Sequence, residues 1–194
     1  KALGGIYNEL KNGEPTGFNP FSLENNSNNI DFLNQLVSIL ATQDGNRLST
    51  KDKETIDFAV KAVLDLPKES RKYGITRLLE NIQDDIDDEN SLKSRLRIWQ
   101  QDGAYGWVFD NESDTLSFDL SSVYGFDGTE ILDNKLIVEP LAFYFLHRIS
   151  MVLDGRRMLL FLDEFWKWIG GDSFKSFIYD GLKTFRKRNG SLIM

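Results

Sequence analysis

Two consecutive acids, Asp163 and Glu164, directly follow the apolar run 158–162. A continuous apolar run predicts a central parallel strand that is buried on both faces. Ligands of open α/β sheets bind beyond the carboxyl ends of the strands, so both carboxylates are expected to emerge at such a site. There Asp163 would hold Mg²⁺ through a water molecule, and Glu164 would orient or deprotonate a water that attacks a γ-phosphate. The alternative is a structural strand whose acidic end is only solvated.

A basic cluster ends the helix that we predict over residues 172–188. It consists of Lys183, Arg186, Lys187 and Arg188. Cations are favoured at helix C-termini by about 0.3–1 kcal/mol each, so the cluster could simply stabilise the end of the helix. A second interpretation is that Arg186 or Arg188 acts as an arginine finger on a γ-phosphate bound by a neighbouring subunit. Nucleic-acid binding is a third interpretation.

Two further titratable residues have both a functional and a structural interpretation. Asp127 ends a short predicted strand, 123–127, and could bind the cofactor near the metal ion, beside Asp163. Its simpler role would be to cap the turn that precedes Thr129. His147 is the only histidine of the chain and lies in an apolar stretch. We interpret it as structural, because no second histidine could share a metal ion with it.

Composition limits the classes of protein to which the chain can belong. Hydrophobic residues make up 41% of its 194 residues, as in soluble globular proteins. It has no cysteine, which excludes a disulfide framework and a thiolate zinc site. The net charge of −7 should repel free nucleic acid on average. The most apolar stretch, 136–153, contains His147 and Arg148 and is therefore a poor membrane span, and no signal peptide is recognisable.

Helical periodicity dominates residues 28–102, where apolar side chains recur at spacings of three and four. The expected helices lie at about 30–40, 50–64, 76–82 and 92–99. Ser49 or Thr50 can cap the second of these helices, and Ser91 can cap the fourth. This stretch is therefore predicted to be an all-helical lobe. The preceding residues, 1–24, are rich in glycine, proline and asparagine and have the chemistry of loops.

After Gly103, strand-like and helix-like segments alternate. We predict strands at 107–109, 116–123, 123–127, 158–162 and 191–194, and helices at 135–153 and 172–188. The helix 135–153 is apolar on most of its faces, so it should lie buried against a sheet. Elements of these lengths in this order are typical of a doubly wound α/β sheet.

Several stretches together resemble the motor ATPases of type IV secretion and conjugation systems, the TrbE/CagE-type proteins of VirB-like machines. The similar stretches are Leu3-Gly4-Gly5-Ile6-Tyr7, Gly17-Phe18-Asn19-Pro20, Gly106-Trp107-Val108-Phe109-Asp110-Asn111, Val123-Tyr124-Gly125-Phe126-Asp127, Asp163-Glu164-Phe165-Trp166-Lys167-Trp168 and 181–190. They follow the order and the spacing of that family. The resemblance spans nearly the whole chain and is weakest in the helical region.

The resemblance implies an α/β RecA-like P-loop NTPase core with a parallel sheet, formed by residues 1–24 and 103–194, with an all-helical lobe inserted at 25–102. It implies that the full-length protein hydrolyses ATP with Mg²⁺ to power pilus assembly and the translocation of DNA or protein. Such proteins assemble into ring-shaped oligomers on the cytoplasmic face of the bacterial inner membrane, with other secretion components as partners. Asp163 and Glu164 would then be the Walker B acids.

The sequence departs from that family in two places. The phosphate-binding pattern G-x-x-x-x-G-K-[ST] occurs nowhere in residues 1–194, and no Thr-Gln pair follows the last predicted strand. We therefore expect the chain to be part of a larger protein and to bind and hydrolyse ATP poorly alone, since the phosphate loop supplies the N–H groups and the lysine that hold phosphates. A chromosome-pumping DNA translocase and a non-catalytic assembly module are the alternative interpretations.

Overall fold

The computed structural model describes residues 4–42, 47–83, 90–153, 157–161 and 190–193. The chain folds as two compact units. The α/β unit combines Lys1–Asn12 with Ser117–Met194, and the helical unit is Gly13–Leu116. The units divide the chain at 12–13 and 116–117, whereas we predicted domain boundaries at 24–25 and 102–103. The assignment of a RecA-like core and an inserted lobe remains a prediction.

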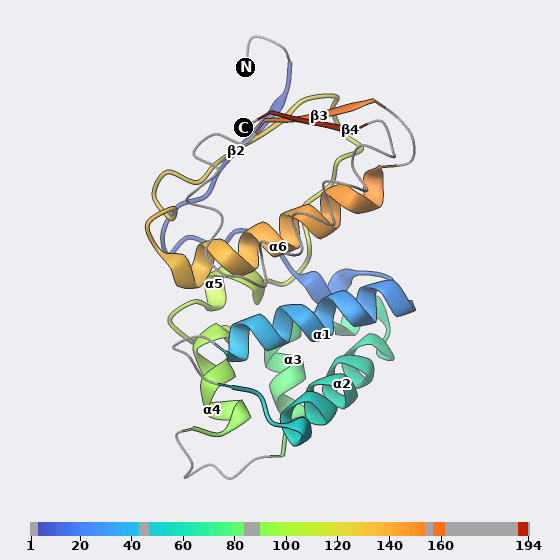
Figure 1. Ribbon diagram of the computed structural model, residues 1–194, viewed down its shortest axis with the longest axis vertical. Helices are drawn as coiled ribbons and strands as arrows, with labels where there is room; N and C mark the ends of the chain where they lie inside the picture. The colour runs from blue at the N-terminus through green and yellow to red at the C-terminus, as the bar shows by residue number, and fades with distance from the viewer. Residues whose placement is uncertain (1–3, 43–46, 84–89, 154–156, 162–189, 194) are drawn as a thin grey trace. The chain divides into compact units, whose positions relative to one another are not determined.

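The helical unit is built from short helices around a shared apolar core. Its elements are η1 (Pro20–Ser22), α1 (Ser27–Ala41), α2 (Thr50–Leu64), η3 (Lys68–Ser70), α3 (Gly74–Glu80), α4 (Leu92–Leu96), η4 (Arg97–Trp99) and α5 (Gly106–Phe109). Helix α1 packs against α2 and α4, and α2 packs against α3 (Figure 1). The side chains of Leu33, Leu36 and Trp99 are fully buried in this core.

The local sequence explains where these helices begin. Asn26 caps α1 by accepting a hydrogen bond of 2.9 Å from the backbone N–H of Asn29. Ser49 and Asp52 form a reciprocal capping box at the start of α2, and Ser91 caps α4. The four predicted helices are confirmed as α1, α2, α3 and α4 together with η4, with ends shifted by a few residues.

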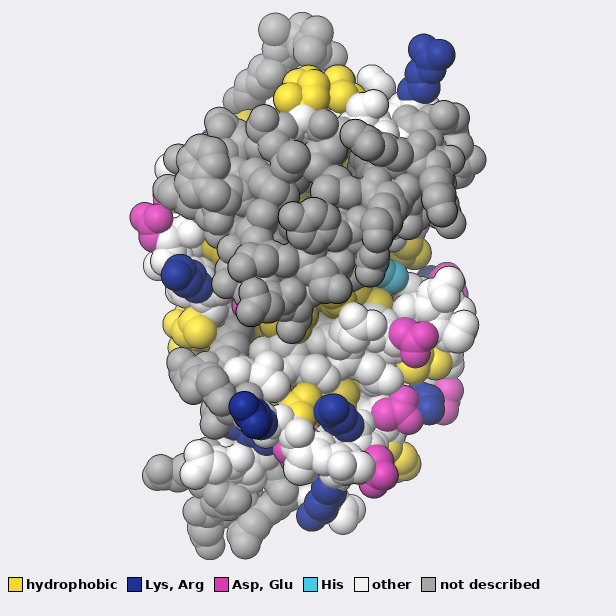
Figure 2. All heavy atoms as spheres, in the orientation of Figure 1, with side chains coloured by type: hydrophobic (Ala, Val, Ile, Leu, Met, Phe, Trp, Pro, Cys, Tyr) yellow, Lys and Arg dark blue, Asp and Glu magenta, His cyan; other side chains and the backbone are white. Residues whose placement is uncertain are grey.

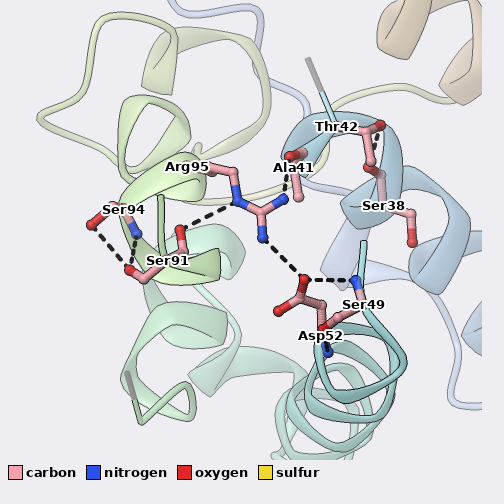
Figure 3. Close-up of polar contacts among 8 residues, drawn as sticks. All are labelled: Ser38, Ala41, Thr42, Ser49, Asp52, Ser91, Ser94 and Arg95. Atoms are coloured by element: carbon pink, nitrogen blue, oxygen red, sulfur yellow. Dashed lines mark hydrogen bonds and ion pairs between the residues drawn. The ribbon is translucent and has the colours of Figure 1, made fainter. Parts of the chain in front are cut away.

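Arg95 joins three of these helix ends (Figure 3). Its guanidinium donates to the carbonyl of Ala41 at the end of α1 (3.1 Å) and to Oδ2 of Asp52 in the first turn of α2 (3.1 Å). A longer bond of 3.4 Å reaches the carbonyl of Ser91. Only 11% of the Arg95 side chain is exposed, so this ion pair is screened less than a surface pair and links the chain on both sides of residues 43–46.

Two predicted strands are wrong. Residues 107–109 lie in the helical turn α5, which lets the consecutive side chains Val108 and Phe109 both be fully buried. A strand would point these two side chains to opposite faces. Residues 116–123 form no strand, because the backbone N–H groups of Leu120 and Ser121 donate to the hydroxyl of Tyr124, each at 2.7 Å, in place of a strand ladder.

The described residues of the α/β unit form two parallel strand pairs and one long helix (Figure 1). Its elements are β1 (Ile6–Glu9), β2 (Tyr124–Asp127), α6 (Lys135–Val152), β3 (Met158–Phe161) and β4 (Gly190–Ile193). Strand β1 pairs with β2, and β3 pairs with β4. The predictions of strands near 123–127, 158–162 and 191–194 and of a helix near 135–153 are confirmed. Strand β1 lies within residues that we expected to be loop.

Helix α6 packs against one strand of each pair. The Phe145 ring lies 4.7 Å from the Phe126 ring of β2. Ile149 and Leu153, near the end of the helix, pack against Met158 and Leu160 of β3. Parallel pairing and a helix packed on the sheet agree with the predicted α/β class.

Strand β3 is not buried on both faces, which corrects the prediction for 158–162. Leu159 is 52% exposed and Phe161 is 65% exposed, while Met158 and Leu160 are half-buried. Successive side chains of a strand point to opposite faces, and α6 covers the face of Met158 and Leu160. Ile193, the register partner of Phe161, is 47% exposed.

Candidate functional site

Most of the predicted site residues lie outside the described residues. These are Asp163, Glu164, Arg186 and Arg188, all within 162–189. Strand β3 ends at Phe161, two positions before Asp163. Of the predicted site residues, Asp127 is the one that the structure describes, at the carboxyl end of β2.

The Asp127 carboxylate is held by two partners. Its Oδ1 accepts hydrogen bonds from the backbone N–H of Thr129 (3.0 Å) and from the Thr129 hydroxyl (2.6 Å). Its Oδ2 accepts a hydrogen bond of 2.7 Å from the hydroxyl of Tyr7. The bonds from Thr129, and then that from Tyr7, lower the pKa of Asp127 to about 2. The carboxylate is therefore ionised at neutral pH and caps the turn before Thr129, as the simpler interpretation proposed.

Two glycines allow β1 and β2 to approach closely enough for the Tyr7 hydroxyl to reach Asp127. Tyr7 is the register partner of Gly125, and a Cβ at Gly125 would lie 2.9 Å from Cδ2 of the Tyr7 ring. The Tyr7 ring therefore lies over Gly125, from where its hydroxyl reaches Asp127. A Cβ at Gly5 would lie 2.9 Å from the carbonyl oxygen of Val123. Two stretches that carry the family resemblance, near Gly5 and Gly125, are thus neighbouring strands whose close approach needs glycine.

The described carboxylates do not form a complete metal site. Within the described ranges, no group of three or more His, Asp and Glu residues could hold a metal ion. Carboxylate oxygens are suitable ligands for Mg²⁺, but three hydrogen bonds already occupy most of the lone pairs of Asp127. Glu9, the register partner of Asp127, is exposed on the same face. The role of Asp127 in cofactor binding remains a prediction.

A buried polar network in the helical unit was missed by the sequence analysis. It joins residues of the Gly17-Phe18-Asn19-Pro20 stretch to residues of the stretch 106–111. Asn19 is fully buried, and its Nδ2 donates to the carbonyls of Arg71 (2.9 Å) and Asn111 (3.0 Å). Nδ2 of Asn111 donates to the carbonyl of Phe18 (2.9 Å). A Cβ at Gly106 would lie 2.0 Å from the carbonyl oxygen of Gln100, so glycine is required there.

Two buried charged side chains come from residues that belong to this network or adjoin it in the sequence. Arg71 is only 6% exposed, and its guanidinium donates to the carbonyls of Leu64 (2.6 Å), Leu66 (2.8 Å) and Leu23 (2.9 Å). Leu64 ends α2, where the helix dipole favours a cation. The Arg71 guanidinium therefore stabilises the C-terminus of α2 by donating hydrogen bonds to carbonyl groups there.

Asp110 has the complementary role at the start of α3. It is 3% exposed and accepts hydrogen bonds from the backbone N–H groups of Ile75 (2.8 Å) and Thr76 (3.2 Å) and from the Thr76 hydroxyl (2.5 Å). Burial raises the pKa of Asp110, although these hydrogen bonds oppose the shift. An acid at a helix N-terminus is favoured by the helix dipole. Asp110 is thus a structural cap.

His147 and Glu139 are half-buried titratable residues of α6. Burial, and then the charge of Arg148, lower the pKa of His147 to about 4, so it is neutral at physiological pH. Burial raises the pKa of Glu139. Arg148 donates a hydrogen bond of 2.8 Å to the hydroxyl of the fully buried Tyr144. These properties agree with the structural interpretation of His147.

No family model matches the chain. It is 40% identical over 198 residues to the type IV secretion system protein VirB4 of Brucella abortus, covering 97% of this chain and 24% of that protein. It is 40% identical over 196 residues to the type IV secretion system protein PtlC of Bordetella pertussis, covering 98% of this chain and 24% of that protein. VirB4 of Bartonella quintana is 39% identical over the whole of this chain. The chain spans about a quarter of the length of these relatives.

A solved structure shows the same fold. VirB4 of Thermoanaerobacter pseudethanolicus superimposes with a TM-score of 0.71 at 20% sequence identity, over 99% of this chain and 80% of that chain. The chain is thus similar to one part of type IV secretion system proteins, and it shares the fold of the solved VirB4 structure. The VirB4 proteins of Brucella abortus and Bartonella quintana are among the proteins to which the chain is similar over nearly its whole length. The predicted resemblance is thereby confirmed.

Proposed function

We propose that this chain is part of the ATPase of a type IV secretion system, which hydrolyses ATP to power pilus assembly and the translocation of DNA or protein. The observation that carries the proposal is 40% identity to VirB4 and PtlC proteins over nearly the whole chain. The parallel pair β3–β4, with Asp163 and Glu164 following β3 in the sequence, adds support. The named relatives favour type IV secretion over a chromosome-pumping translocase.

The proposed core is RecA-like, with Mg²⁺ and ATP bound at the carboxyl edge of the sheet. Asp163 would hold Mg²⁺ through a water molecule, and bound Mg²⁺ would supply charge neutralisation to the phosphates. Glu164 would orient the attacking water or accept its proton. Asp127 would act at the same edge chiefly by fixing the turn to Thr129, because its oxygens already accept three hydrogen bonds.

The proposed partners are further copies of the same protein in a ring and other secretion components at the bacterial inner membrane. Cargo DNA or protein would be moved indirectly. None of the described helices is long and apolar enough to cross a membrane. In the helical unit, Figure 2 shows Lys and Arg side chains together with Asp and Glu side chains, which suits contacts with protein partners better than direct binding of nucleic acid.

Substitution of Glu164 in a full-length protein tests the proposal. Glu164→Gln keeps the size of the side chain and removes the base, so turnover of ATP should be lost while nucleotide binding is kept. Glu54→Gln, at an exposed position of α2, is the matched control and should leave turnover unchanged. An unchanged rate in Glu164→Gln would remove Glu164 from the mechanism. A wild-type protein that hydrolyses no ATP would favour a non-catalytic assembly module.

A further inference from the structure

The first and last segments of the helical unit are hydrogen-bonded to each other. The backbone N–H of Thr16 donates to the carbonyl of Trp107 (3.0 Å), and that of Thr115 donates to the carbonyl of Gly17 (2.8 Å). Gly17 has a φ of +73°, and a Cβ there would lie 2.5 Å from Oγ1 of Thr115. The two ends of the unit are therefore held side by side, and glycine is required at the contact.

Two asparagines reinforce this contact, and we refer to Asn19 and Asn111 as the asparagine clamp. Asn19 donates to the carbonyl of Asn111, 92 residues away. Asn111 in turn donates to the carbonyls of Phe18 (2.9 Å) and Trp107 (3.2 Å). Oδ1 of Asn19 also accepts a hydrogen bond of 3.1 Å from the backbone N–H of Phe21. Each asparagine thus contacts both the first and the last segment of the unit.

The clamp also contacts the connection between α2 and α3. Asn19 donates to the carbonyl of Arg71, and the carbonyl of Asn111 accepts a hydrogen bond of 3.1 Å from the backbone N–H of Tyr73. Tyr73 has a φ of 53°, in the left-handed region that few residues other than glycine adopt. The surrounding hydrogen bonds hold it there. Three segments that are distant in the sequence are therefore fixed at one point inside the helical unit.

Hydrogen bonds within the helical unit hold its first and last segments together. The unit therefore does not need the α/β unit to bring its two ends side by side. The entropy cost of bringing residues 16 and 115 together is offset within the unit. A buried polar network whose members are satisfied also specifies one arrangement of the chain. We propose that the asparagine clamp makes residues 13–116 a self-contained cooperative unit, which keeps its structure when the α/β unit opens. This inference is independent of the proposed function.

Hydrogen exchange of the whole 194-residue chain tests the independence of the unit. Phe126→Ala removes a ring that packs against Phe145 and should open the α/β unit. Exchange of the hydrogen-bonded Ile6 and Leu10 amides should then accelerate about 10-fold or more, as expected for a loss of at least 1.4 kcal/mol. Exchange of the Thr16 and Tyr73 amides should stay within about twofold of wild type, since local units open separately. Equal acceleration in both units would overturn the proposal.

Substitution of the clamp is the second arm of the test. Asn111→Ala should accelerate exchange of the Thr16, Tyr73 and Thr115 amides about 10-fold or more, because it removes the hydrogen bonds that Nδ2 of Asn111 donates to the carbonyls of Phe18 and Trp107. Asn28→Ala, at an exposed position in the first turn of α1, is the control and should change nothing. Unchanged exchange in Asn111→Ala would disprove the clamp.

A milder variant decides the outcome if Asn111→Ala fails to fold. Thr16→Val keeps the shape of the side chain and removes a hydroxyl that donates to the carbonyl of Val108 (2.6 Å) and accepts from Nδ2 of Asn111 (3.3 Å). The proposal expects the Tyr73 and Thr115 amides to exchange several-fold faster in this variant. Wild-type exchange rates at both amides would contradict the clamp.

Discussion

The hydroxyl of Tyr7 on β1 donates a hydrogen bond of 2.7 Å to Oδ2 of Asp127 on β2, although the two residues are 120 positions apart in the sequence. The bond joins the second residue of β1 to the last residue of β2. Tyr7 is 49% exposed, and its own pKa is raised by this bond. The pair therefore couples the ionisation of Asp127 to the pairing of β1 and β2.

Tyr7→Phe should raise the pKa of Asp127 above about 2 but not to its ordinary value of about 3.9, since both bonds from Thr129 remain. Thr129→Val should raise it further. Because the pKa of Asp127 is lower in the folded protein, its stabilisation is present above pH 4 and is lost as the pH falls through 2. Titration of the carboxyl carbon by NMR measures each pKa, and Tyr124→Phe is the control. The same pKa in Tyr7→Phe and wild type would contradict the coupling.

Gly5→Ala should destabilise the β1–β2 pair more than Gly125→Ala does. The added Cβ at Gly5 would press on the backbone oxygen of Val123, which accepts the Ile6 hydrogen bond, whereas the one at Gly125 meets the ring of exposed Tyr7, which can swing away. Overpacking against backbone costs about 1–3 kcal/mol. Hydrogen exchange of the Ile6 amide measures the difference. Gly125→Ala should instead raise the pKa of Asp127, as Tyr7→Phe does, and equal exchange in both variants would refute this ranking.

The elements that local chemistry determines could be predicted from the sequence. The capping box of Ser49 and Asp52 and the cap at Ser91 depend on neighbouring residues, and the helices begin there. Strand β1 could not be predicted, since Ile6–Glu9 is short and its pairing partner lies more than 100 residues away. The 107–109 stretch was assigned wrongly, because burial of both Val108 and Phe109 depends on tertiary packing.

The candidate site was predictable only in part. The apolar run 158–162 contains strand β3, as predicted, and β3 ends two positions before Asp163 in the sequence. Asp163 itself lies outside the described residues. The roles of Asn19 and Asn111 could not be inferred from residue type, because an asparagine in a glycine- and proline-rich stretch predicts a turn. Their long-range hydrogen bonds show that some stretches similar to the family are structural.

His147 provides a further test, because it is the only histidine of the chain and gives a single NMR titration. Its midpoint should lie at about pH 4 in the folded protein. Since the folded pKa is below the unfolded value of about 6.5, the neutral form is favoured on folding, and the resulting stabilisation is lost as the pH falls from 6.5 to 4. His147→Gln should remove this part of the pH dependence, and a midpoint near 6.5 would contradict the burial of the ring.

The last prediction concerns Arg186 and Arg188 and rests on the proposed function. A helix over residues 172–188, as the sequence predicts, would be about 25 Å long and would carry both arginines away from their own Asp163 and Glu164. If either arginine acts on a γ-phosphate, that phosphate must then belong to a neighbouring subunit. Arg186→Ala or Arg188→Ala in a full-length protein should therefore lower ATP turnover on the order of 10³-fold without preventing assembly.

Mixed oligomers test this geometry. Subunits with Glu164→Gln that keep both arginines should partly restore turnover to subunits that lack the arginines, because each kind of subunit supplies the group that the other lacks. Lys53→Ala, at an exposed position of α2, is the control for loss of a positive charge and should leave turnover unchanged. If mixing restores nothing although both variants assemble normally, the arginines do not act between subunits. The basic cluster would then serve only to stabilise the C-terminus of its helix, as the helix dipole favours.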